Sequence, residues 1–112
     1  MRIVNRELCA LFSGLIRCEY CQRPAFGGTH CAHIFSRGAG QVDIPGNLIG
    51  LCAPCHHDSH NMNNRRLITR YDLLRTAAER EGLEPSEIED AVMAIRRHPK
   101  HLPLPAHLER FL

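Results

Sequence analysis

Residues 51–60 read LCAPCHHDSH, in which two cysteines spaced Cys-x-x-Cys are followed by three histidines within five positions. A structural zinc takes four soft or borderline ligands in a tetrahedron, and a Cys-x-x-Cys pair places two thiolates on one tight turn. A second pair of the same spacing occurs in RCEYCQ at 17–22. Together the pairs predict one zinc closed by four thiolates, from Cys18, Cys21, Cys52 and Cys55. Because this set leaves no open position, the zinc is expected to be structural.

The four cysteines complete the coordination of that zinc, so the three histidines of residues 51–60 are not needed as its ligands. Pro54 suits the first turn of a helix, so we expect a helix to begin near it. His56 and His60 would then lie one turn apart on a shared face. Two imidazoles in this arrangement predict a pair of ligands for a second divalent ion, whereas a solvated helix face is the alternative interpretation.

The segment between the two cysteine pairs contains two short apolar stretches. HCAHIFS (30–36) and NLIGLC (47–52) have the length and composition of strands, and the Gly/Pro-rich loop 37–46 separates them. They are expected to pair as an antiparallel hairpin. Closure by zinc would then bring His33, on the first strand, and Asn47, at the start of the second, toward the helix at Pro54.

The rest of the chain is expected to be helical. One helix is predicted over about 64–81, ended by Gly82, and another over 85–97. Their inward faces would be Leu67, Tyr71, Leu74 and Ala78 in the first helix, and Ile88, Val92 and Ile95 in the second. The last dozen residues are expected to form an extended tail. The fold class is therefore α+β, a single domain over 1–112 with a zinc-stapled hairpin-and-helix core at 18–60 and a helical extension and tail at 62–112.

The run CEYC…AHIFSRG…NLIGLCAPCHHDSH resembles the HNH endonuclease motif, the ββα-metal finger, in its form with a four-cysteine zinc. The His-x-x-x-His ending is also similar to that of the colicin DNases. The resemblance implies that His33 is a general base and that Asn47 holds the loop of that base. It further implies that His56, and with it His60, binds a catalytic ion.

This chain departs from the family pattern at one position. The family commonly carries Asp or His as a metal ligand just before the base, and this chain has Ala32. Asp58 lies two residues from His56 and so on another helical face, which leaves Asp43, in the loop, as the candidate replacement. An ion held mainly by two imidazoles, water and phosphate favours Mn²⁺ over Mg²⁺ and weak binding in the absence of DNA.

Charge predicts a partner that carries phosphate. The basic residues are almost all arginine, whose planar fork suits phosphate oxygens. Residues 1–75 hold nine arginines against five acidic residues, whereas residues 76–112 hold five basic residues against seven acidic ones. Arg37, Arg66 and Arg70 are the candidate contacts to a DNA backbone, although a solvated basic surface is the alternative explanation of these charges.

Three functional hypotheses follow from these patterns. The leading one is a metal-dependent DNA endonuclease that nicks one strand of duplex DNA per event, as a monomer or weak dimer. A non-catalytic zinc module that binds nucleic acid or protein explains the cysteines but not the spacing of the three HNH positions. A secreted disulfide mini-protein is disfavoured, because no signal-cleavage site follows the apolar stretch 8–16 and two Cys-x-x-Cys pairs indicate metal binding. We expect a cytoplasmic protein of bacterial or phage origin, with Cys9 and Cys31 as buried free thiols.

Overall fold

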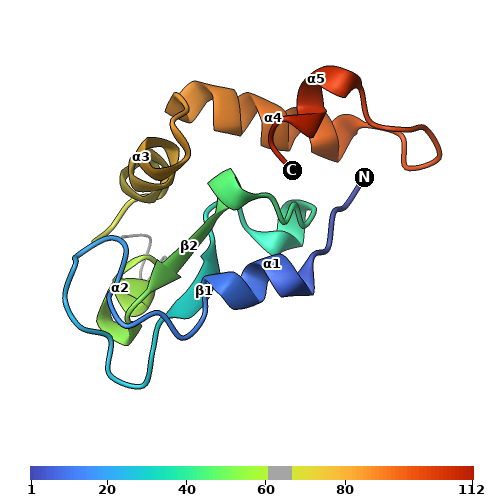
Figure 1. Ribbon diagram of the computed structural model, residues 1–112. Coiled ribbons are helices and arrows are strands. Elements are labelled where there is room, and N and C mark those ends of the chain that lie inside the picture. The colour runs from blue at the N-terminus through green and yellow to red at the C-terminus, as the bar shows by residue number, and fades with distance from the viewer. Residues whose placement is uncertain (61–66) are drawn as a thin grey trace.

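The computed structural model describes residues 1–60 and 67–112. A two-stranded hairpin occupies the centre, and helices surround it (Figure 1). The helices are α1 (Arg6–Leu11), α2 (Ala53–Asp58), α3 (Arg70–Glu81), α4 (Pro85–Arg97) and α5 (Ala106–Glu109), with 3-10 turns at Arg37–Ala39 and Pro45–Asn47. No helix in the two described ranges combines the length and the apolar character needed to cross a bilayer.

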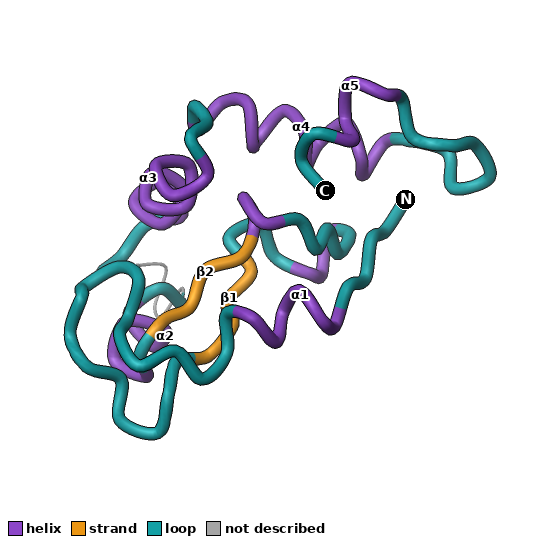
Figure 2. The backbone as a smooth tube through the Cα atoms, viewed as in Figure 1, coloured by secondary structure: helices purple, strands orange, loops and turns teal. Residues whose placement is uncertain are grey.

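The predicted hairpin is confirmed, with shorter strands. β1 (His30–His33) pairs antiparallel with β2 (Leu48–Leu51), and His30 lies opposite Leu51 while His33 lies opposite Leu48 (Figure 2). The ladder ends early because the side chain of Asn47 takes both backbone groups of Phe35. All four residues of β2 are buried, so this strand is the centre of the core.

The helix predicted near Pro54 is also present, but it is short. Cys52 is the N-cap of α2, and Pro54 lies in its first turn. The helix ends at Asp58, and Ser59 is its C-cap. The prediction that His60 shares this helix with His56 is therefore wrong, since His60 follows the helix in a bend.

The predicted start of the next helix is wrong by several residues. Thr69 accepts a hydrogen bond from the Asp72 amide, and the Asp72 carboxylate accepts one from the Thr69 amide, so this capping box begins α3 at residue 70. Leu67 precedes the helix and is 80% exposed, while Tyr71 is 58% exposed. The predicted inward face is therefore wrong at Leu67 and Tyr71 and confirmed at Leu74 and Ala78. The buried residues are Leu73, Leu74, Ala77 and Ala78. The helix ends at Gly82 as expected, in the left-handed conformation with φ 69°.

The last long helix has the bounds and the face that its pattern predicts. α4 buries Ile88, Val92 and Ile95. It packs against α3, and both helices contact the 3-10 turn Pro45–Asn47. The approach is so close that a Cβ atom on Gly46 would lie 2.8 Å from Ile88 Cδ1. The tail is not wholly extended, because it includes α5, which buries Leu108.

Arg80 of α3 joins the helical extension to the hairpin. Its Nη1 atom donates to both carboxylate oxygens of Glu19 at 3.0 Å, and Nη2 donates to the carbonyls of Leu48, at 2.9 Å, and Pro45. Glu19 in turn accepts a hydrogen bond from the Gly50 amide at 2.8 Å. One guanidinium thus ties α3 to the first cysteine loop and to β2.

Candidate metal and catalytic site

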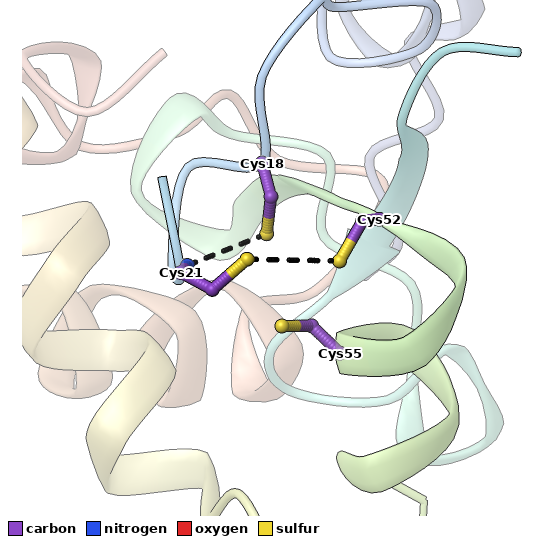
Figure 3. Close-up of side chains that lie close together, drawn as sticks. All are labelled: Cys18, Cys21, Cys52 and Cys55. Atoms are coloured by element: carbon purple, nitrogen blue, oxygen red, sulfur yellow. Dashed lines mark hydrogen bonds between the residues drawn. The ribbon is translucent and has the colours of Figure 1, made fainter. Parts of the chain in front are cut away.

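The four cysteines of the two pairs form one cluster. Their sulfur atoms all lie within 4.8 Å of one another, and the side chains point toward a common centre (Figure 3). The Sγ atoms of Cys21 and Cys52 are 3.8 Å apart. A tetrahedral zinc with Zn–S bonds of about 2.3 Å requires sulfur–sulfur edges of about 3.8 Å. The cluster therefore fits a zinc ion.

The acidity of the thiols differs from one cysteine to the next. Burial acts to raise the pKa of Cys18, but hydrogen bonds from backbone amides, that of Cys21 first, lower it to about 7. Burial and the neighbouring Cys9 raise the pKa of Cys31 to about 12. Burial also raises the pKa values of Cys52 and Cys55 in the cluster, so the geometry of the four sulfur atoms, and not thiol acidity, identifies the metal site. Cys9 and Cys31 are free, as expected, but half-buried rather than buried.

A cleft of about 910 Å³ brings together most of the site residues that the sequence predicts. It lies against the hairpin, and α1, α2 and α3 contribute to its walls. Its lining includes His33, His56, His60, Arg37 and Arg70. Asn47 is not part of the lining, and Arg66 falls outside the described residues.

Asp43 holds His33. Its Oδ1 atom lies 2.7 Å from His33 Nε2, and its side chain is fully buried while that of His33 is 13% exposed. Burial acts to raise the pKa of Asp43, but hydrogen bonds from the Asn5 amide, His33 and Gln41 outweigh this effect and lower the pKa. Asp43 is therefore an ionised partner of His33, and with Cys9 and His33 it forms a group whose possible ligand atoms all lie within 4.8 Å of one another.

The N-terminal segment supports this carboxylate. Asp43 Oδ2 accepts hydrogen bonds from the Asn5 amide at 2.7 Å, Gln41 Nε2 at 3.0 Å and Cys9 Sγ at 3.4 Å. The Asp43 amide donates to the Ile3 carbonyl at 2.8 Å. These contacts join residues up to 40 positions apart, so sequence spacing gave no signal for them.

The pairing with Asp43 sets the tautomer of His33. An ionised carboxylate can only accept hydrogen bonds, so His33 Nε2 carries the proton. In the neutral ring, Nδ1 is then the basic nitrogen. Within the described part of the chain, no hydrogen bond occupies His33 Nδ1. The geometry therefore suits His33 to accept a proton from a molecule in the cleft.

Asn47 is fully buried and holds the loop next to His33. Its Oδ1 atom accepts a hydrogen bond from the Phe35 amide at 2.7 Å, and Nδ2 donates to the carbonyls of Phe35 at 3.3 Å and Val42 at 2.9 Å. Residue 47 thereby ties the two ends of the loop 35–42. These are the side-chain-to-backbone bonds that the sequence interpretation expected.

Three histidines gather beside α2. His56 Nδ1 lies 3.4 Å from His30 Nδ1, and the ring centroids of His56 and His60 are 4.9 Å apart. Burial first, then the nearby His60 and His30, lowers the pKa of His56 and keeps its ring neutral. Neutral imidazole is the form that binds a metal. Sequence reasoning missed His30, although the strand alternation that puts it on the face of Ala32 could have found it.

Three arginines line the cleft, Arg6, Arg37 and Arg70, and Arg96 supports the turn that carries Arg37. Arg37 is exposed at the start of a 3-10 turn, and Arg96 donates to carbonyls on either side of it, at Ser36 (2.8 Å) and Gly40 (2.9 Å). Arg70 is exposed, donates from Nε to the Ile34 carbonyl at 3.2 Å, and stacks over the Phe35 ring.

Residues 18–62 match the family model described as HNH endonuclease. The matched segment contains both cysteine pairs, the hairpin and α2. Comparisons with curated proteins and with solved structures gave no match. Residues 18–62 are thus similar to an HNH endonuclease domain, and the four-cysteine cluster fits the zinc subtype of that family.

Proposed function

We propose that this protein is a metal-dependent endonuclease that hydrolyses phosphodiester bonds of duplex DNA. The observation that carries the proposal is the state of His33. Its Nε2–H group is bonded to a buried carboxylate, its Nδ1 atom has no hydrogen bond to residues 1–60 or 67–112, and the ring borders a cleft that also holds His56 and exposed arginines. The HNH match over the same segment supports a nuclease.

His33 is the general base in this proposal. Its Nδ1 atom takes a proton from water as the water oxygen forms a bond to phosphorus and the bond from phosphorus to the 3′ oxygen breaks. Asp43 stabilises the positive charge that the ring then acquires, because it accepts the Nε2–H bond at 2.7 Å. Asn47 acts indirectly by fixing the loop beside His33.

His56 and His60 are the proposed protein ligands of the catalytic ion. A divalent cation supplies, when bound, positive charge that offsets the negative charge developing on the phosphate and the leaving oxygen. The pair fits a cation, since the rings lie side by side and burial favours the neutral form of His56. Two nitrogen ligands favour Mn²⁺ over Mg²⁺.

The arginines on the cleft are the proposed contacts to DNA. Arg37 and Arg70 are exposed and line the cleft, so their guanidinium groups can reach backbone phosphates. Arg66 is proposed for the same role from the sequence alone. A single site of this kind cuts one strand per event, so a monomer or weak dimer in the cytoplasm of a bacterial or phage-infected cell would nick duplex DNA.

Relaxation of supercoiled plasmid tests the proposal. The purified, zinc-loaded protein is incubated with Mn²⁺, Mg²⁺ or EDTA, beside His33→Ala and, as a matched control, His57→Ala, whose side chain is 68% exposed. We expect open-circle product that requires the ion. Loss of a general base should slow cleavage roughly 10²- to 10⁴-fold, and the control should cut like the parent. Intact plasmid with every ion, from protein that retains zinc, would contradict the proposal and favour the non-catalytic zinc module.

A further inference from the structure

His30 and His56 come together with a geometry that no hydrogen bond explains well. Their Nδ1 atoms are 3.4 Å apart, and the rings meet edge to face with centroids 5.6 Å apart. Hydrogen bonds from nitrogen are typically 2.7–3.2 Å long. Two imidazole nitrogens bound to one cation at about 2.1 Å in tetrahedral geometry lie about 3.4 Å apart. The observed separation is that of two ligands on one ion.

The backbone fixes this juxtaposition. His30 is the first residue of β1 and lies opposite Leu51, which directly precedes the N-cap of α2 at Cys52. The His56 amide donates to the Cys52 carbonyl at 2.9 Å. The two histidines are therefore held by the strand register at one end and by the cysteine cluster at the other.

The neighbouring side chains leave room for such a ligand. Alternate residues of a strand share a face, so His30 lies on the same face as Ala32, whose methyl group offers no donor atom. Asp43, the other candidate donor, is committed to His33. His60 lies beside His56, but the three histidines are not among the described clusters whose ligand atoms all approach within 4.8 Å.

We propose that His30 is a ligand of the divalent ion, and that His30 and His56 are the principal protein ligands of that ion. This assignment rests on the proposed nuclease function only for the identity of the ion. His30 is exposed and lies just outside the residues that line the cleft, so the ion would lie at the cleft's edge, beside the start of β1.

Binding of Mn²⁺ tests the assignment without any cleavage. Free Mn²⁺ is measured by its electron paramagnetic resonance signal during titration of zinc-loaded protein, since Mn²⁺ does not displace zinc from thiolates. His30→Ala is compared with the parent and with His57→Ala as the matched control. Loss of a partner that merely supports a ligand weakens metal binding roughly 10- to 100-fold, so loss of His30 should raise the Kd at least about tenfold. His57→Ala should leave the Kd unchanged, and zinc content reports on folding.

A rescue variant sharpens the test. In His30→Ala/Ala32→Asp, a carboxylate on the same face replaces the lost nitrogen, and we expect Mn²⁺ affinity to recover. Unchanged affinity in His30→Ala, or loss only in His60→Ala, would overturn the assignment while plasmid nicking by the parent still upheld the nuclease. If Mn²⁺ binding requires His30 but the parent protein leaves plasmid intact, the assignment of His30 as a ligand would be supported and the proposed nuclease function would be contradicted.

Discussion

A 2.7 Å hydrogen bond joins Asp43 to His33, and the two residues flank the loop 35–42 on either side. The side chain of Asp43 has no exposed surface. A buried carboxylate is stable only when its charge is well compensated. Here the compensation comes from donors in the N-terminal segment and from His33 itself. The pair is therefore a fixed feature of the fold, and it sets which nitrogen of His33 faces the cleft.

Asp43→Asn should slow cleavage with little loss of DNA binding. An amide can donate to His33 Nε2, which would move the proton to Nδ1 and remove the basic nitrogen from the cleft. We expect a roughly 10²- to 10⁴-fold lower single-turnover rate, as for loss of the base. Asp90→Asn, an exposed acid on α4, is the matched control and should cut normally. A normal rate in Asp43→Asn would show that the tautomer of His33 does not matter.

Asn47→Ala should destabilise the protein. The change leaves the Phe35 amide and the Val42 carbonyl without partners in the core, which costs about 1–3 kcal/mol in the free energy of unfolding. Urea unfolding of zinc-loaded protein measures this. Asn47→Asp retains the acceptor for Phe35 but loses both donated bonds, so it should not restore full stability; parent-like unfolding of either variant would contradict the role of residue 47.

Zinc binding should depend on the four clustered cysteines only. Cys18→Ser removes a thiolate ligand, so we expect purified protein to lack stoichiometric zinc and to be largely unfolded, since zinc binding contributes on the order of 10 kcal/mol in small zinc domains. Cys31→Ser is the control and should keep one zinc per chain. Zinc content is read by atomic absorption and folding by circular dichroism. Full zinc occupancy in Cys18→Ser would rule out the four-thiolate site.

Cys31 should resist alkylation near neutral pH. Its pKa is raised to about 12, above the usual thiol value of about 8.5, so almost none of it is thiolate at pH 8. Reactivity should rise as pH increases toward 12 and should be normal once the chain is denatured. Mass spectrometry after iodoacetamide treatment measures the modified fraction. Labelling of native Cys31 at the rate of a free thiol would contradict the raised pKa.

Arg80→Ala should destabilise the protein, because it removes the contacts of α3 with the first cysteine loop and with β2. The change removes the partner of Glu19 and of the Leu48 carbonyl, for an expected loss of about 1–3 kcal/mol. Arg75→Ala on the same helix is the matched control, since Arg75 is exposed. Urea unfolding followed by circular dichroism compares the two. Equal midpoints would show that the bridge contributes nothing to stability.

Local patterns predicted the parts of the structure that local chemistry determines. The cysteine spacing predicted the cluster, and the position of Pro54 predicted α2. The start of α3 was missed because the apolar period was counted from Leu67, whereas the Thr69 capping box decides where the helix begins. An N-cap signal outweighs a weak apolar stripe in a helix with several exposed apolar residues.

The missed site residues depend on contacts between distant segments. The partner of His33 is held by Asn5 and Cys9, and no spacing rule connects residues 5 and 43. His30 could have been predicted, since strand alternation and the hairpin register are both local rules. The family pattern instead places the metal ligand just before the base, where this chain has Ala32.

Cys55 and His56 are consecutive residues on one short helix, so the sulfur cluster determines where the imidazole lies. Any ion that His56 binds is then thermodynamically linked to zinc. We expect zinc to bind first, because the position of His56 depends on the cluster that zinc would close. Coupling between the affinities of two binding sites is reciprocal, so an ion at His56 should also raise the affinity for zinc. The zinc available to the cell would therefore determine what fraction of the protein can bind the second ion, and the second ion would in turn favour retention of zinc.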